Sequence, residues 1–244
     1  MTAIQTVDLT KRYKSKIAVN GINLTVNEGE LFALLGVNGA GKTTTIKMLS
    51  CLIAPTSGDA RLRGNSIVSS PNDVKQIINV SPQETAVARN LSVRENLEMI
   101  AGIYGFTNKQ SKGKAQDMIE KFHLEEVSQS RAKTLSGGMQ RRLSIALALI
   151  SDPQILFLDE PTLGLDVLAR RDLWHIIEKL KGKITIILTT HYMEEAEALS
   201  DRIGIMSDGV LKAIGTSEEL IAQTKTKNLE DAFISMASGR ESMI

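Results

Sequence analysis

Short runs of mostly apolar residues are the clearest pattern in this chain, and polar or turn-forming residues follow each of them. The runs occupy residues 31–35, 155–158, 184–188 and 203–206. Bare apolar runs of this length are typical of strands that are covered on both faces. They therefore predict a mostly parallel sheet that is buried inside the protein.

Helical periodicity separates the apolar runs. Within residues 44–52, Ile46, Leu49 and Leu52 recur near one face, and the pattern ends before Pro55. Residues 143–150 form a similar pattern that ends before a proline. Strands that alternate with helices predict an α/β fold.

The middle of the chain has a different pattern. From residue 84 to residue 130 there is no comparable strand run, but Ser92 and Glu95 have the spacing of a helix capping box. Residues 114–122 also have helical periodicity. We therefore predict an inserted α-helical subdomain in this part of the chain.

Composition limits the class of protein. The 244 residues suffice for one domain with an insertion, and the net charge of +1 gives no electrostatic reason to expect nucleic acid as a partner. One cysteine, Cys51, excludes an intrachain disulfide; we expect it to be buried, in a reducing, cytoplasmic setting. No apolar run approaches the roughly 18–20 residues that cross a bilayer, and the N-terminus lacks the features of a signal peptide. Any membrane role is therefore expected to depend on a partner.

A glycine-rich loop follows the first apolar run. Residues 36–43 fit the pattern G-x-x-x-x-G-K-[ST], in which successive backbone N–H groups surround phosphate oxygens. Lys42 is expected to neutralise the outer phosphates, and the Thr43 hydroxyl to ligate Mg²⁺. The expected nucleotide-binding residues of this segment are Gly36, Asn38, Gly39, Ala40, Gly41, Lys42, Thr43 and Thr44.

Two adjacent acids follow the second apolar run. Because neighbouring strand residues point to opposite sides, Asp159 and Glu160 can serve different roles. We expect Asp159 to hold Mg²⁺, directly or through water, and Glu160 to polarise the water that attacks the γ-phosphate. The alternative is a solvated pair of acids at the end of a strand.

Two further polar residues follow apolar segments. His191 lies after the third run and could reach a terminal phosphate, although a lone histidine is usually structural. Gln83 follows residues 77–82, where its neutral amide could touch Mg²⁺ or the attacking water; on its own it would be an ordinary loop residue. We predict catalytic roles for both, and a metal-binding role for Gln83.

A second glycine-containing phrase precedes the helical run of residues 143–150. It reads Leu-Ser-Gly-Gly-Met-Gln over residues 135–140, and we call it the signature phrase. A serine hydroxyl and exposed glycine amides at the start of a helix form an anion site. Ser136, Gly137 and Gly138 are the expected phosphate-binding residues, whereas an ordinary helix cap would be the interpretation without the first loop.

Together, the loop, the acid pair and the signature phrase resemble the nucleotide-binding subunit of an ATP-binding-cassette (ABC) transporter, over residues 4–236. The resemblance implies a P-loop NTPase fold with an antiparallel β part near the N-terminus. It also implies a head-to-tail dimer in which Ser136 and Gly138 bind the γ-phosphate held by the other copy, Tyr13 stacks on adenine and Asp166 communicates across the interface. The implied single ABC ATPase domain covers residues 1–236, with a nucleotide-binding core (1–83 and 152–220), a helical subdomain (84–151) and a C-terminal helical tail (221–244).

The subgroup that the chain resembles serves export permeases of the ABC-2 type, as in drug-resistance and sodium-efflux cassettes. Residues 189–197 and 228–233 carry this placement, whereas Val167 and residues 86–90 depart from the usual pattern. The resemblance implies an ATPase subunit that uses ATP and Mg²⁺ and pairs with a second copy or a homologous cassette. It would energise a separate membrane permease for a small molecule, ion or drug from the inner face of the cell membrane.

Two other functions remain as alternatives. A soluble ATP-switched interaction module would share the cassette, but such relatives usually carry two cassettes or long coiled coils. A P-loop kinase would leave the signature phrase unexplained.

Overall fold

Two β-sheets form the centre of the structure, a computed structural model that describes residues 1–238. The larger sheet has the strand order β10-β9-β3-β8-β7-β6 and is parallel except for β10, which confirms the predicted core sheet. Its strands are β3 (Leu31–Leu35), β6 (Ile78–Ser81), β7 (Ile155–Asp159), β8 (Thr185–Thr190), β9 (Arg202–Ser207) and β10 (Val210–Gly215).

The four apolar runs coincide with four of these strands, but three of the strands, β7, β8 and β9, extend past the ends of their runs. β7 continues to Asp159, and β8 starts one residue later than predicted and continues to Thr190. These added polar residues are buried at the carboxyl edge of the sheet, where neighbouring side chains and loops satisfy them. Hydrophobicity alone therefore misses the ends of the strands that carry polar chemistry.

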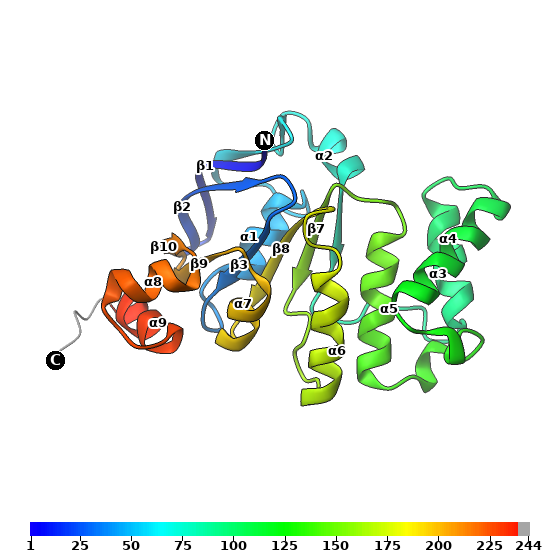
Figure 1. Cartoon of the computed structure of the whole chain (residues 1–244). Helices are drawn as coiled ribbons and strands as arrows, with labels where there is room; N and C mark the ends of the chain where they lie inside the picture. The colour runs from blue at the N-terminus through cyan, green and yellow to red at the C-terminus, as the bar shows by residue number, and fades with distance from the viewer. Residues whose placement is uncertain (239–244) are drawn as a thin grey trace.

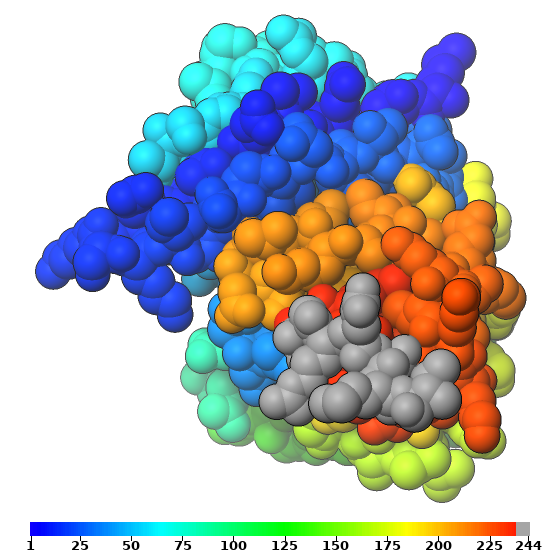
Figure 2. Space-filling model, turned by 90° about the vertical axis from the view of Figure 1, so that its left-hand side faces the viewer, coloured from blue at the N-terminus to red at the C-terminus, as the bar shows by residue number. Residues whose placement is uncertain are grey.

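The smaller sheet is the antiparallel β part that the resemblance implied. Its strand order is β2-β1-β4-β5, and its strands are β1 (Thr2–Tyr13), β2 (Lys16–Asn27), β4 (Ser57–Leu62) and β5 (Asn65–Ser66). The long β1–β2 hairpin lies against the segment of β9 and β10, drawn in orange in Figure 2, and the backbone N–H of Asn20 donates to the Gly209 carbonyl at 2.8 Å.

Helices cover both faces of the larger sheet (Figure 1). They are α1 (Lys42–Leu49), α2 (Pro71–Ile77), α3 (Val93–Ile103), α4 (Asn108–Lys121), α5 (Gly137–Leu149), α6 (Val167–Glu178), α7 (Met193–Leu199), α8 (Ser217–Thr224) and α9 (Leu229–Ser238). Along β3, Leu31, Ala33 and Leu35 face the core that includes α5, α6 and α7, whereas Phe32 and Leu34 face the core that includes α1 and the smaller sheet. The alternation of a strand thus divides one sheet between two apolar cores.

Helices α3, α4 and α5 lie together at the opposite end of the molecule from α8 and α9 (Figure 1). Residues 84–151, all of which are described, contain these helices and two short 3₁₀ turns, at Glu125–Val127 and Ala132–Thr134, but no strand. The predicted capping box is present, because the Ser92 and Glu95 side chains each bind the other's backbone N–H. The exact boundaries of a helical subdomain remain a prediction.

Some local predictions were wrong. Helix α1 starts at Lys42 and ends at Leu49, so Leu52 lies beyond it with 65% of its surface exposed. Cys51 has a φ of +56°, which ends the helical path, and it is only half-buried. The C-terminal helical tail, residues 221–244, stays a prediction: its described residues contain the end of α8 and all of α9, and residues 239–244 lie outside the described residues.

Within residues 1–238, none of the helices combines the length and the apolar character that a membrane span requires.

Candidate functional site

The glycine-rich loop connects β3 to α1 at the carboxyl edge of the larger sheet. A Cβ on Gly36 would lie 2.4 Å from the Met206 carbonyl oxygen, and Gly41 has a φ of +108°. Both positions therefore require glycine. Gly41 is the N-cap of α1 and offers no side-chain hydrogen bond, so the first N–H groups of this helix are open to an anion.

Lys42 is buried within this loop, with 4% of its surface exposed. Its ammonium donates to the carbonyls of Gly36 (2.7 Å) and Val37 (3.2 Å) and lies 3.4 Å from Glu160 Oε1. Burial lowers the pKa of Lys42, and the nearby Glu160 carboxylate opposes that shift. The loop therefore holds a cation directly beside one of the two predicted acids.

The two acids at the end of β7 make separate contacts. Asp159 Oδ1 accepts hydrogen bonds from the hydroxyls of Thr43 (3.2 Å) and Thr189 (2.5 Å). Glu160 instead contacts Lys42 and places its Oε2 3.2 Å from His191 Nδ1. The adjacent carboxylates thus face different partners.

The oxygen atoms of Thr43 and Asp159 fit Mg²⁺, which prefers hard oxygen ligands. Among residues 1–238, no group of three or more His, Cys, Asp or Glu residues could hold a metal by itself. A shell that the protein completes only in part is typical of Mg²⁺, which usually keeps several waters and binds phosphate oxygens as well.

A cavity of about 460 Å³ brings most of the predicted nucleotide-binding residues together. It is lined by Tyr13, Lys16, Ala18, Asn38, Gly39, Ala40, Gly41, Lys42, Thr43, Thr44, Gln83 and Glu160. Three other predicted residues do not line the cavity but contact residues that do: Asp159 contacts Thr43, His191 contacts Glu160 and Gly36 contacts Lys42. Segments that are far apart in the sequence therefore meet around one opening.

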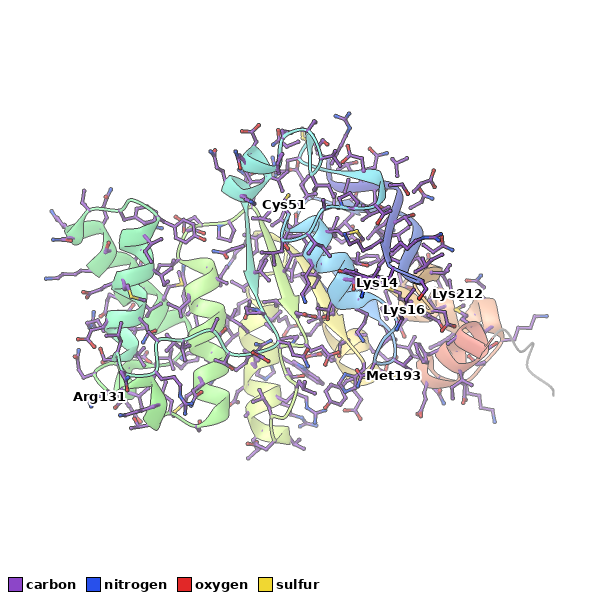
Figure 3. All side chains as sticks on the ribbon, turned by 180° about the vertical axis from the view of Figure 1, so that it is seen from behind. Lys14, Lys16, Cys51, Arg131, Met193 and Lys212 are labelled. Carbon is purple, nitrogen blue, oxygen red and sulfur yellow. The ribbon has the colours of Figure 1, made fainter. Side chains whose placement is uncertain are left out.

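The tip of the β1–β2 hairpin forms one wall of this cavity. Tyr13 is 46% exposed, and the Lys11 ammonium lies 5.2 Å from the centre of its ring. Lys14 and Lys16 lie together at the hairpin tip (Figure 3), and Lys16 also lines the cavity. Sequence reasoning had identified Tyr13 but not Lys16.

The signature phrase and Asp166 do not line this cavity. Ser136 caps its own helix, because its hydroxyl accepts from the Met139 N–H at 3.3 Å. Asp166 caps α6 in the same way by accepting from the Ala169 N–H at 2.9 Å. A Cβ on Gly138 would lie 3.1 Å from the Ala169 Cβ, so these two helix starts are neighbours. Gly137, by contrast, has open space at its Cα.

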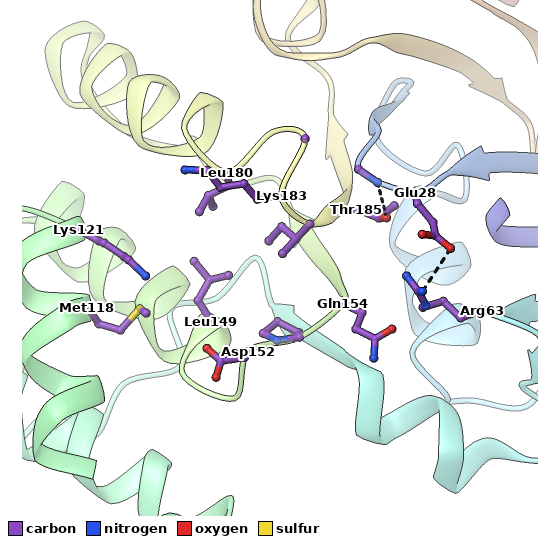
Figure 4. Close-up of a pocket in the computed structure, with 14 residues that line it drawn as sticks. Glu28, Arg63, Met118, Lys121, Leu149, Asp152, Gln154, Leu180, Lys183 and Thr185 are labelled. Carbon is purple, nitrogen blue, oxygen red and sulfur yellow. Dashed lines mark hydrogen bonds and ion pairs between the residues drawn. The ribbon is translucent and has the colours of Figure 1, made fainter. Parts of the chain in front are cut away.

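A larger cavity of about 670 Å³ lies where β7 and β8 begin, away from the glycine-rich loop (Figure 4). Lys121 and Met118 of α4 lie on one side of it, and Glu28 pairs with Arg63 on the other. None of the predicted site residues lines this cavity. Volume therefore does not identify the functional site in this protein.

Two buried charged residues near the site were not predicted from the sequence. Arg141 of α5 donates hydrogen bonds to main-chain carbonyls beside Gln83 and on both sides of Glu160. Glu195 of α7 accepts from the side chains of Thr162 (2.8 Å) and Trp174 (3.1 Å). A charged residue next to another one, as in Arg141-Arg142 and Glu194-Glu195, gives no signal in the sequence for which of the two is buried.

Comparisons with known proteins agree with this geometry. The family model described as ABC transporter matches residues 19–163. The chain is 41% identical to the daunorubicin/doxorubicin resistance ATP-binding protein DrrA of Streptomyces peucetius, over 89% of this chain and 66% of that protein. It is 39% identical to the probable multidrug ABC transporter ATP-binding protein YbhF of Escherichia coli, over 96% of this chain and 42% of that protein.

A longer relative matches part of its sequence to this chain, and solved structures of similar length share its fold. ABC transporter A family member 9 of Arabidopsis thaliana is 47% identical over 83% of this chain, which spans only 22% of that protein. A solved ATP-binding subunit of an ABC transporter superposes with a TM-score of 0.85 at 28% identity, covering 96% of this chain and 99% of that one. The dimeric cassette MJ0796 bound to ADP and Pi has a TM-score of 0.78 at 25% identity, covering 87% of this chain and 98% of that one.

The resemblance in the sequence is thus confirmed. Because the family model covers more than half of the chain, from β2 through the two acids, and because the relatives include subunits of similar length, the chain belongs to the ABC transporter family as an ATP-binding cassette.

Proposed function

We propose that this chain is an ATP-hydrolysing subunit that energises a separate membrane permease, for export of a small molecule, ion or drug. The observation that carries the proposal is the cavity of about 460 Å³, which joins a phosphate-binding loop, an exposed tyrosine, Gln83 and Glu160. The names of the relatives support the export direction, since DrrA and YbhF are described as drug-resistance and multidrug proteins. The compound that is exported is not encoded in this site.

ATP would bind with its phosphates over the loop and the start of α1. Lys42, which donates to the Gly36 and Val37 carbonyls, would bind the outer phosphates. Tyr13 has the exposed ring that stacking on adenine requires. Thr43 and Asp159 would hold Mg²⁺, together with Gln83, which lines the same cavity as Thr43.

Glu160 is the proposed general base for hydrolysis. Its Oε2 faces His191 and its Oε1 faces Lys42, so the carboxylate is held between a residue that would bind phosphate and one that would orient it. When bound, Mg²⁺ neutralises the charge of the phosphate oxygens during phosphoryl transfer. Glu160 would then take a proton from the attacking water, while His191 would hold the terminal phosphate.

A second cassette would complete the site. Ser136, Gly137 and Gly138 lie outside the cavity of their own chain and therefore have no phosphate to bind within a monomer. Beside them, Val167 and Leu168 at the start of α6 are 62% and 76% exposed. An apolar face next to an open helix start suits a partner copy that carries ATP, as in the proposed head-to-tail dimer with a copy of this chain or a homologous cassette.

The permease would dock beside Gln83, at the junction between the nucleotide-binding core and the proposed helical subdomain, residues 84–151. A hollow of about 240 Å³ there is lined by Pro82, Ile100, Ile103 and Tyr104 together with residues of α5. Ile103 is 71% exposed and Tyr104 is 48% exposed. This apolar hollow suits an apolar loop of a membrane protein, and docking would place the chain on the inner face of the cell membrane.

Two measurements test the proposal. Purified chain should release inorganic phosphate from Mg-ATP, and Lys42→Ala should lose both nucleotide binding and this activity. Gentle detergent extraction of source membranes, followed by pulldown on the chain, should recover an integral membrane protein. Recovery of soluble partners alone, or transfer of phosphate to a small molecule in place of its release, would refute the transporter assignment.

A further inference from the structure

Arg141 connects the signature helix α5 to the main chain of the catalytic segments. We propose that it is a positioning residue that aligns the metal-binding and catalytic residues Gln83, Asp159 and Glu160, so that movement of α5 alters the hold on Mg²⁺. The inference rests on the proposed ATPase function and deepens it. It assigns a task to a side chain that does not itself touch the nucleotide cavity.

The hydrogen bonds of Arg141 reach two segments that are far apart in the sequence, residues 82–83 and residues 159–161. Nη1 donates to the carbonyls of Pro82 (2.5 Å) and Gln83 (3.3 Å). Nη2 donates to the Asp159 carbonyl at 2.9 Å, and Nε donates to the Pro161 carbonyl at 2.7 Å. One guanidinium therefore fixes the backbone of Gln83 and the residues on both sides of Glu160.

The surroundings of Arg141 make this task specific to arginine. The side chain is buried, with 4% of its surface exposed, and no carboxylate among residues 1–238 lies within ion-pair distance of it. Burial lowers the pKa of Arg141 to about 10, with the charges of Asp159 and Glu195 opposing the shift, so the group stays protonated at neutral pH. Its planar fork donates in several fixed directions at once, which a lysine ammonium cannot reproduce.

The position of Arg141 in α5 connects the signature phrase to the segments that Arg141 holds. It lies five residues after Ser136, which in an α-helix is about 7.5 Å along the axis. One turn further, the Ser144 hydroxyl lies 3.3 Å from the Ser81 hydroxyl of β6, so the same face of α5 contacts the strand that leads to Gln83. A partner nucleotide that binds at Ser136 would therefore shift a helix that is attached directly to the metal-binding residues.

The next residue provides a matched control. Arg142 is on the same helix, but its Nη2 pairs with the 61% exposed carboxylate of Asp172 at 2.9 Å. Arg141→Lys and Arg142→Lys make the same chemical change one position apart. Only the first removes donors from the carbonyls beside Gln83 and Asp159.

The test measures metal binding without turnover. With the non-hydrolysable analogue AMP-PNP bound, Mn²⁺ affinity is measured by electron paramagnetic resonance, and AMP-PNP affinity is measured separately in EDTA. Arg141→Lys should weaken Mn²⁺ binding by about tenfold, the lower end for loss of a group that supports metal ligands, and change AMP-PNP binding in EDTA by less than about twofold. Arg142→Lys should bind Mn²⁺ as the wild type does.

A double-mutant cycle separates positioning from a general loss of structure. In a Gln83→Ala background, Arg141→Lys should cost less Mn²⁺ affinity than in the wild type, because one of the residues that Arg141 positions is gone. Additive losses, or unchanged Mn²⁺ affinity in a folded Arg141→Lys protein, would overturn the inference. Wild-type protein that binds no AMP-PNP and releases no phosphate from ATP would instead refute the proposed function.

Discussion

Replacing Glu160 by glutamine tests whether the two acids have separate roles, Asp159 in metal binding and Glu160 in proton transfer. The side chain keeps its size, but it loses the charge and the ability to take a proton. In the structure Glu160 is 7% exposed and contacts Lys42 at 3.4 Å and His191 at 3.2 Å, whereas Asp159 contacts Thr43 and Thr189. The substitution should therefore leave the Thr43–Asp159 pair in place and remove only the proposed base.

These contacts predict that Glu160→Gln lowers turnover but does not weaken ATP binding. Loss of a general base lowers kcat by about 10²–10⁴, which corresponds to about 2.7–5.5 kcal/mol in activation free energy. At 3.4 Å, two unit charges interact by about 5 kcal/mol at an effective dielectric constant of 20, before the cost of desolvation is subtracted. Glutamine frees Lys42 from most of this attraction and no longer repels the γ-phosphate, so ATP should bind as tightly as in the wild type or up to about tenfold more tightly.

The assay measures phosphate release at saturating Mg-ATP and ATP affinity by equilibrium titration. Glu194→Gln is the matched control, because its side chain is 83% exposed and lies 3.8 Å from Arg170; it should leave both quantities unchanged. A Glu160→Gln protein with kcat within about threefold of the wild type would remove Glu160 from the mechanism. A loss of ATP affinity of more than tenfold would show that Glu160 serves in binding instead.

Three further predictions concern assembly, pH and the loop. Ser136→Arg should retain ATP binding but lose ATP-dependent dimer formation, measured by light scattering, and hydrolysis; normal dimers would refute capping in trans. Burial raises the pKa of Glu195, so the contribution of this residue to folding stability falls as pH rises above its unfolded pKa of about 4.3. The Tm of Glu195→Gln relative to wild type should therefore increase from about pH 5 to about pH 8. A Tm difference that stays constant with pH would contradict this. Gly41→Ala should lower the free energy of unfolding, measured by urea titration, by about 2–4 kcal/mol, because the new Cβ would lie 2.5 Å from the Ala18 carbonyl oxygen at a φ of +108°. Gly39→Ala should lower it by only about 1 kcal/mol, because Gly39 has a φ of +85° but open space around it.

The apolar pattern predicted the core sheet well because its strands are buried on both faces. Such strands carry apolar residues toward both faces over most of their length, so the runs are visible without any knowledge of the fold. The long hairpin of β1 and β2 gave no such signal, since many of its outward residues are exposed and β1 contains irregularities in register. Its presence was inferred only from the resemblance to a family.

The candidate site could be predicted where the backbone performs the chemistry. The glycines of the loop leave a direct trace in the sequence, because Gly36 and Gly41 have no room for a Cβ. The acids Asp159 and Glu160 were visible because they follow a buried run. Arg141 left no comparable trace, since its partners are main-chain carbonyls that residues of any type would supply.

The contacts of α5 link the signature phrase to the proposed catalytic residues. Lys42 lies 3.4 Å from Glu160, and Gln83 is fixed to α5 through its backbone carbonyl. The proposed catalytic residues therefore lie together in one chain, whereas the signature phrase, on the same helix as Arg141, lies outside their cavity. Because Ser136 and Arg141 lie on one helix, binding of a phosphate at Ser136 would act on residues 82–83 and 159–161 through the hydrogen bonds of Arg141. Signature binding and metal binding should accordingly be coupled, and Arg141→Lys should weaken that coupling while both individual sites persist.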